Sequence, residues 1–168
     1  MRERGTILIG MAAGAAWSVL LLWGAARFVQ LPVFTLMPTI MTAFLAPGLV
    51  MAVMVGRLAA RRFFDDGAIG GGGFAPGSGG DIDRRVLANT AEQMVLALCI
   101  WPAAAVLLGG AGPGVIVVLG LGLALSRLAF WLGYHLAPAL RAFGFAAGFY
   151  PTVLVALWAL WALVTRGG

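Results

Sequence analysis

Five long apolar stretches constrain what this chain can fold into more than any other feature of its sequence. They cover residues 6–29, 37–60, 86–108, 115–140 and 144–164, and each has the roughly 20 mostly apolar residues that a helix needs to cross a bilayer. The 168-residue chain is 62% hydrophobic and 10% charged, whereas a soluble domain averages roughly 45–50% apolar and about 25% charged residues. The sequence therefore predicts an all-α integral membrane protein with five spans.

The beginning of the chain could be mistaken for a secretory signal peptide, because Arg2 and Arg4 precede the first apolar stretch. That stretch is too long, and the segment LLWGAARFVQ offers no small-residue cleavage site. We therefore interpret it as a retained helix. Prolines at 32, 38 and 47 flank or interrupt the start of the second stretch, and we expect a kink near Pro47 because proline removes a backbone donor and clashes with the preceding turn.

Two of the connections between spans have distinctive compositions. Residues 61–84 are rich in glycine and contain four aspartates, which predicts a mobile, solvated loop. This loop has no G-x-x-x-x-G-K-[ST] pattern for binding phosphate groups. By contrast, the uncharged GGAGPG at 109–114 predicts a tight hairpin turn.

Arginine alone gives the chain its net charge of +5, since it contains no lysine. The arginines lie at the ends of apolar stretches rather than in a solvated patch, which argues against nucleic acid as a partner. Their unequal distribution predicts a multi-pass protein of a bacterial-type inner or plasma membrane, with the N-terminus and long loop cytoplasmic and the C-terminus outside. The cytoplasmic side would carry Arg2, Arg4, Arg57, Arg61, Arg62, Arg84, Arg85 and Arg141, and the other side Arg27 and Arg166.

The third apolar stretch has a polar face. Arg85, Asn89 and Glu92 follow one another at intervals of four and three residues. In a helix they fall within roughly 60° of one another, at about 100° per residue. Because lipid does not solvate such groups, this face is expected to contact protein or water.

The fourth stretch carries Arg127 near its middle, and Tyr134 and Arg141 follow seven and fourteen residues later, on nearly the same helical face. An arginine deep in a span costs about 2.5–3.5 kcal/mol on insertion scales, so Arg127 needs a partner. Glu92 is the only acid near membrane depth, which predicts an ion pair between these two. Such polar groups can simply hold helices together, but three arginines against one carboxylate favour an anionic ligand.

These segments resemble a known family. RVLANTAEQ resembles the R-x-x-x-N-x-x-E signature of the MAPEG family, the membrane-associated proteins in eicosanoid and glutathione metabolism, and SRLAFWLGYHLAPALRAFG is similar to a later helix of that family. The resemblance covers about residues 38–164. It implies a MAPEG-like four-helix bundle over residues 37–168, assembled as a homotrimer, with residues 1–36 as one extra N-terminal transmembrane helix. Glutathione would lie between neighbouring subunits, in a pocket open toward the cytoplasm.

The resemblance also implies roles for individual residues. Arg85 and Arg127 would contact the carboxylates or backbone of glutathione, and Asn89 would hydrogen-bond its peptide. Glu92 would bind the ammonium of the γ-glutamyl group, and Tyr134 would line the site. This set suits a ligand with two carboxylates and one ammonium, because arginine binds carboxylates in a bidentate manner.

Arg141 matches the arginine that stabilises the glutathione thiolate, and Arg61 or Arg62 matches a basic residue contributed by the neighbouring subunit. An arginine is always charged and therefore favours the thiolate, which is the nucleophilic form. Two positions depart from the family pattern: Phe130 stands where many members have tyrosine, and Gln93 where an aromatic residue or asparagine is frequent.

We therefore expect a glutathione transferase or peroxidase that uses glutathione as co-substrate and acts on small lipophilic electrophiles. A non-enzymatic membrane scaffold with the same fold is one alternative. A small transporter is another, since charges within spans are typical of transporters, although no inverted repeat is visible. We expect no metal site, because His135 is the single histidine and we interpret it as an interfacial or packing residue. The single cysteine, Cys99, excludes an internal disulfide and is interpreted as a packing residue.

Overall fold

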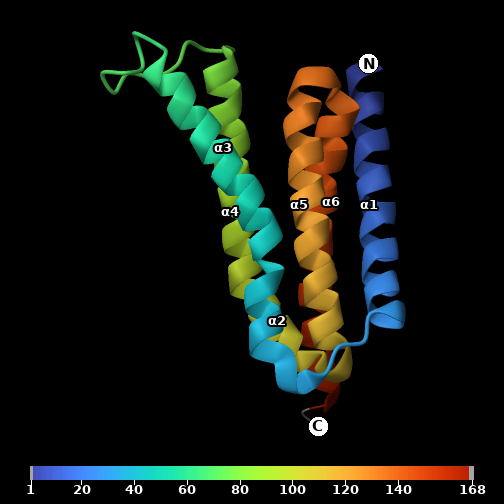
Figure 1. Cartoon of the computed structure of the whole chain (residues 1–168). Helices are drawn as coiled ribbons and strands as arrows, with labels where there is room; N and C mark the ends of the chain where they lie inside the picture. The colour runs from blue at the N-terminus through green and yellow to red at the C-terminus, as the bar shows by residue number, and fades with distance from the viewer. Residues whose placement is uncertain (1, 167–168) are drawn as a thin grey trace.

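The computed structural model describes residues 2–166, which form a bundle of long helices (Figure 1). Its helices are α1 (Arg2–Phe28), α2 (Leu36–Ala43), α3 (Leu45–Phe63), α4 (Gly79–Leu107), α5 (Gly112–Leu136) and α6 (Pro138–Arg166), with short 3-10 turns at Val33–Thr35 and Gly109–Ala111. The described residues contain no strand. Five helical segments are long and apolar enough to cross a membrane. This confirms the all-α membrane class and the five spans.

The helices form two groups that diverge toward one end of the molecule. Figure 1 shows α3 and α4 running together and leaning away from α5, α6 and α1, and the two groups meet near α2. The N-terminus and the connection between α3 and α4 lie at the open end, and the C-terminus lies at the opposite end. This arrangement agrees with the predicted orientation, while the identity of the cytoplasmic face stays a prediction. The side chains of Arg2 and Arg166 lie outside the described residues.

The additional helix α1 packs chiefly against α6. Gly10 and Gly14 of α1 permit this contact, because a β-carbon at Gly10 would overlap the carbonyl oxygen of Ala139 and one at Gly14 would overlap the β-carbon of Ala146. Two glycines four residues apart allow helix backbones to approach closely in a membrane. Helix α1 is therefore held at a defined distance from α6.

The apolar core is centred on α5, the most enclosed of the five spans. Val115, Leu119 and Val155 contribute fully or almost fully buried side chains to it. Trp101 of α4 is also buried, stacks on Phe44 at 5.3 Å between ring centroids, and donates a hydrogen bond from Nε1 to Oγ1 of Thr152 at 3.3 Å. Satisfying the one polar atom of this indole allows it to be buried between α4 and α6.

Two local predictions about the helix connections are confirmed. The second span is interrupted at Phe44, between α2 and α3, three residues before Pro47. Because Pro47 has no backbone N–H, the carbonyl of Ala43 loses its helical donor, which accounts for the predicted kink. The GGAGPG segment is the predicted tight turn, with a single 3-10 turn before α5 begins at Gly112.

Two predicted boundaries are wrong. The fourth span ends at Leu136 instead of residue 140, so Arg141 lies in the first turns of α6 and not on α5. Ala137 is extended, with φ −162° and ψ 138°, as expected for a residue before proline, and Pro138 suits the first position of a helix.

The third span begins at Gly79, well before residue 86, with Ser78 Oγ accepting a hydrogen bond from the N–H of Asp81 at 3.3 Å. Asp81 and Asp83 therefore lie in α4, where they are 2% and 3% exposed. Their assignment to a solvated loop was wrong, because arginines pair with both carboxylates and permit their burial.

Candidate functional site

A cavity of about 390 Å³ opens between α4 and the group formed by α1, α5 and α6. Its volume falls within the range of roughly 300–1,000 Å³ that is typical of small-molecule sites. Most of its wall is apolar, and its polar groups come from three side chains. The lining residues are Ile7 and Met11 of α1, Asn89 of α4, Phe130 and Tyr134 of α5, and Arg141, Ala142 and Phe145 of α6.

The cation of this cavity is Arg141, which is positioned by the turn between α5 and α6. Gly133 lets the start of α6 approach α5, because a β-carbon there would overlap the backbone of Arg141. The guanidinium of Arg141 lies 5.1 Å from the ring centroid of Tyr134, and the Tyr134 ring meets Phe130 edge to face at 5.2 Å. Within the described residues the Arg141 side chain has no acidic or hydrogen-bonding partner, so its charge is available to a ligand.

Asn89 provides the opposite polar wall and also connects two charged residues. Its Oδ1 accepts a hydrogen bond from Nη1 of Arg127 at 2.9 Å, and its Nδ2 donates to Oε2 of Glu92 at 3.3 Å. The predicted ion pair between Arg127 and Glu92 is wrong, because no such pair occurs in the part of the chain that the structure describes. Asn89 bonds to both charged side chains, but Arg127 is fully buried whereas Glu92 is exposed on α4.

Arg127 is buried and has no carboxylate partner among residues 2–166. Its Nη2 donates to the carbonyl oxygen of Gly144, and its guanidinium lies 4.9 Å from the ring centroid of Phe130. Within the part of the chain that the structure describes, its Nε and both amide atoms of the buried Gln93 have no hydrogen-bond partner. Arg127 thus joins α4, α5 and α6 from within the bundle, and its side chain does not line the cavity.

Arg85 and Glu92 lie outside the cavity as well. The Arg85 side chain is 59% exposed and donates from Nη2 to Oδ2 of Asp81 at 2.7 Å. Of the six residues predicted for the site, the structure therefore brings Asn89, Tyr134 and Arg141 together and leaves the other three outside. Arg85 and Glu92 are exposed on α4, whereas Arg127 is buried on α5.

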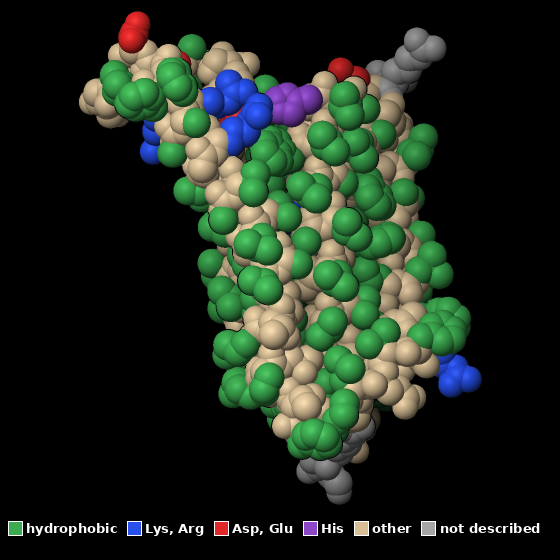
Figure 2. Space-filling view, viewed as in Figure 1, with side chains coloured by type: hydrophobic (Ala, Val, Ile, Leu, Met, Phe, Trp, Pro, Cys, Tyr) green, Lys and Arg blue, Asp and Glu red, His purple; other side chains and the backbone are tan. Residues whose placement is uncertain are grey.

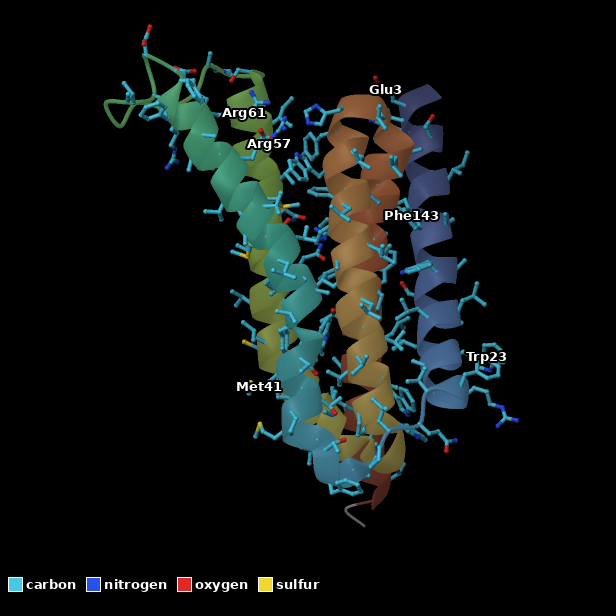
Figure 3. All side chains as sticks on the ribbon, viewed as in Figure 1. Glu3, Trp23, Met41, Arg57, Arg61 and Phe143 are labelled. Atoms are coloured by element: carbon cyan, nitrogen blue, oxygen red, sulfur yellow. The ribbon has the colours of Figure 1, made fainter. Side chains whose placement is uncertain are left out.

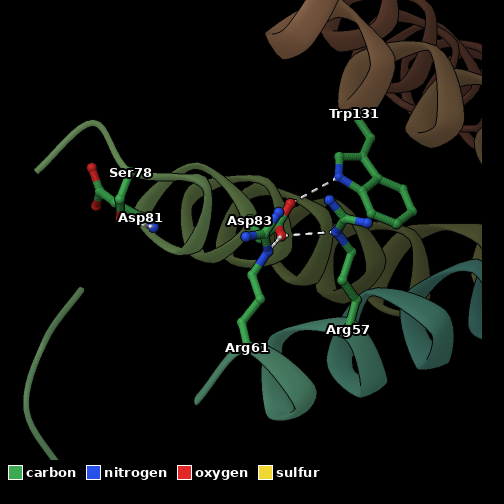
Figure 4. A network of polar contacts seen from close by, with 6 residues as sticks. All are labelled: Arg57, Arg61, Ser78, Asp81, Asp83 and Trp131. Atoms are coloured by element: carbon green, nitrogen blue, oxygen red, sulfur yellow. Dashed lines mark hydrogen bonds and ion pairs between the residues drawn. The ribbon is translucent and has the colours of Figure 1, made fainter. Parts of the chain in front are cut away.

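A polar network centred on Asp83 was not predicted from the sequence (Figure 4). This carboxylate accepts hydrogen bonds from Nε of Arg57 at 2.9 Å, from Nε of Arg61, and from Nε1 of Trp131 at 3.0 Å. The network joins α3, α4 and α5, and Figure 3 shows its two arginines, Arg57 and Arg61, at the open end of the bundle. The only sequence signal was the presence of acids just before an apolar stretch, and it did not identify their partners.

The other unexpected contribution comes from α1. Ile7 and Met11 close one side of the cavity, although nothing in the first stretch distinguishes them from the apolar residues around them. They reach the cavity because Gly10 and Gly14 hold α1 close to α6.

The five apolar spans define a multi-pass helical membrane protein, and it contains a mostly apolar cavity beside a buried polar cluster. The MAPEG family model matches residues 35–161, and the chain belongs to this family. It is thus an integral membrane protein of a family associated with glutathione. Helix α1 lies outside the matched residues. No curated protein and no solved structure matches the chain.

Proposed function

We propose that the cavity between α4, α5 and α6 binds glutathione as a co-substrate, and that the protein is a glutathione transferase or peroxidase for lipophilic electrophiles. The observation that carries this proposal is the unpaired guanidinium of Arg141, stacked on Tyr134 at a cavity whose opposite wall is Asn89. A permanent positive charge beside a bound thiol stabilises its thiolate and so raises its nucleophilicity. Asn89 can hydrogen-bond the peptide of the tripeptide.

The apolar part of the cavity suits the second substrate. Phe130, Phe145, Ile7 and Met11 surround the polar groups, and apolar walls favour a ligand that partitions from the bilayer. In a conjugation, the thiolate would form a carbon–sulfur bond with the electrophile and displace its leaving group as an anion. In a peroxide reduction, the thiolate would attack the terminal oxygen and break the O–O bond, which gives the alcohol and a sulfenic acid of glutathione. A second glutathione would then displace water from the sulfenic acid to form the disulfide.

A homotrimer, as in the family resemblance, would account for the exposed charges of α4. Glu92 lies about 20 Å along α4 from Gly79, at 1.5 Å per residue, and its side chain is exposed. A carboxylate at this depth is costly against lipid. We propose that another copy of the chain covers this face, where Arg85 and Glu92 could reach the carboxylate and ammonium groups of glutathione across the subunit boundary.

Replacement of Arg141 tests the function directly. Isothermal titration should detect glutathione binding to the purified wild type, and Arg141→Ala should lower kcat/KM toward a lipophilic electrophile about 100-fold, as expected for the loss of one charge-stabilising group. Arg141→Lys should recover part of the loss because it retains the charge. Arg27→Ala is the matched control, since Arg27 is exposed at the other end of the bundle. No heat with millimolar glutathione and an intact oligomer would contradict the proposal.

A non-enzymatic scaffold is the alternative, and the burial of Arg127 favours it. This side chain is 0% exposed and bonds to Asn89 and to a backbone carbonyl, as a structural residue does. The scaffold interpretation predicts that Arg127→Met disrupts assembly, whereas Arg141→Ala changes neither assembly nor any measured activity. Loss of activity in Arg141→Ala with normal assembly selects the enzyme.

A further inference from the structure

We propose that the chain has a second binding site, for the phosphate headgroup of an anionic phospholipid, in the groove between α3 and α5. The groove has a volume of about 280 Å³ and is lined by Arg57, Trp131, Leu132 and His135. None of these residues lines the larger cavity assigned to glutathione. The two sites are therefore distinct in their composition.

The buried carboxylate of Asp83 builds this site. Its side chain is 2% exposed, and it accepts hydrogen bonds from both Nε of Arg57 and Nε1 of Trp131 (Figure 4). The guanidinium of Arg57 consequently lies 5.3 Å from the ring centroid of Trp131, within the range of a cation–π contact. The Arg57 guanidinium and the Trp131 indole, which both belong to residues that line the groove, are thus held in position before any ligand binds.

Arg57, which lines the mostly apolar groove, carries positive charge that its surroundings compensate only in part. Two arginines, Arg57 and Arg61, share the single carboxylate of Asp83. The terminal nitrogens of Arg61 lie against Gly79, 2.8 and 2.9 Å from the position of an added β-carbon. Those of Arg57 have no acceptor among the described residues, and the Arg57 side chain is 44% exposed. A guanidinium with free terminal N–H groups suits bidentate binding of a phosphate.

The single histidine adds a second polar group to the wall. His135 is exposed at the end of α5, and Figure 2 shows it beside a group of arginine side chains at the open end of the molecule. Hydrophobic side chains cover the flank below them in the same view. The groove thus lies where a charged end of the bundle meets an apolar surface.

The depth of the groove favours a lipid over a free phosphate ion. Arg57 lies about 9 Å from the end of α3 and Trp131 about 7.5 Å from the end of α5, at 1.5 Å per residue. Tryptophan is enriched at this interfacial level, and basic pockets between transmembrane helices bind anionic headgroups.

The apolar surface continues toward the centre of the membrane on both helices. Leu132 at the groove is 53% exposed, and one turn deeper Val53 of α3 is 61% and Leu128 of α5 is 40% exposed. This surface suits an acyl chain attached to the bound phosphate. An inorganic phosphate ion would make no use of it.

Native mass spectrometry of the full chain in mild detergent tests the proposal. The probes are phosphatidylglycerol, phosphatidylcholine and inorganic phosphate, each added at equal concentration. Wild type should retain phosphatidylglycerol in preference to phosphatidylcholine. Arg57→Gln should lower that retention about tenfold, the effect of losing one charged hydrogen-bonding contact. Arg84→Gln is the matched control, because Arg84 is 62% exposed and does not line the groove.

A second variant leaves the Asp83 network intact, in case Arg57→Gln disturbs the fold. His135→Glu places a negative charge in the groove from an exposed side chain, and it should also reduce retention of phosphatidylglycerol at an unchanged size-exclusion profile. Equal retention of phosphatidylglycerol by wild type and His135→Glu would overturn the proposal, as would equal retention of the two lipids by wild type. Displacement of the lipid by millimolar inorganic phosphate would assign the groove to free phosphate instead.

Discussion

Replacing Asp83 with asparagine should weaken the packing between the three helices that its carboxylate joins. The substitution keeps the size of the side chain but removes the charge that Arg57 and Arg61 share. The amide oxygen of the asparagine can still accept a hydrogen bond from one of the N–H donors around Asp83. The new NH₂ group replaces a carboxylate oxygen and therefore faces an N–H donor, with which it cannot form a hydrogen bond. We expect a correctly inserted protein in which α3 and α5 are less firmly attached to α4 at the open end.

The contacts of Asp83 set the expected loss of stability. A hydrogen bond from the Trp131 indole to a charged acceptor contributes about 1.5–3 kcal/mol. The two arginine side chains are 44% and 36% exposed, so solvent screening limits each pair to about 0.5 kcal/mol. Because the asparagine retains one acceptor, the free energy of unfolding should fall by about 2 kcal/mol.

Equilibrium unfolding by sodium dodecyl sulfate in mixed micelles, followed by tryptophan fluorescence, would measure this loss. Asp66→Asn is the matched control, because Asp66 is exposed in the connection between α3 and α4. A double-mutant cycle with Trp131→Phe should give a coupling energy of about 1 kcal/mol, since both changes remove the same hydrogen bond. A change below about 0.5 kcal/mol for Asp83→Asn, the range of ordinary surface substitutions, would refute the assignment of Asp83 as the connecting residue.

Three further predictions concern close helix packing and assembly. Gly14→Ala should weaken the attachment of α1 in the same unfolding assay, whereas Gly24→Ala in the same helix should not, since an added β-carbon has no neighbour within 4 Å at Gly24. Gly148→Ala should destabilise the bundle by about 1–3 kcal/mol, because its β-carbon would overlap the buried amide of Gln93; a thermal midpoint equal to that of wild type would contradict the buried polar cluster. If copies of α4 meet in the oligomer, the exposed Cys99 should give dimers on a denaturing gel after treatment with a short bismaleimide, and Cys99→Ser should give none.

Part of the cavity lining was predictable from the sequence, and Arg141 shows why. Its residue type and its place after the RVLANTAEQ segment distinguished it, and it lines the cavity although it was assigned to the wrong helix. Its role toward glutathione stays a prediction. Arg141 still meets Tyr134, because the turn at Pro138 returns the chain to the end of α5. Arg127 shows the opposite case: its depth in a span was predicted, but its partners are an amide and a carbonyl oxygen instead of Glu92.

The packing of neighbouring helices decided the exposure of other single residues. Cys99 was interpreted as a packing residue but is exposed on α4. His135 was interpreted as an interfacial or packing residue, and its exposed position at the groove between α3 and α5 agrees with the interfacial interpretation. An apolar sequence context indicates membrane depth for these residues. It does not indicate which side of the helix faces a neighbour.

The sequence by itself determined the membrane class, the number of spans and the tight turn before α5, because the transfer of a residue into lipid depends on local composition and adds up along one helix. Only the tertiary structure decided which polar groups meet. The partners of Asp83 and Arg127, and the closure of the cavity by α1, depend on how each helix is rotated and how closely glycines let it approach its neighbours. Those quantities are set by contacts between residues far apart in the chain, which the pattern of one segment does not contain.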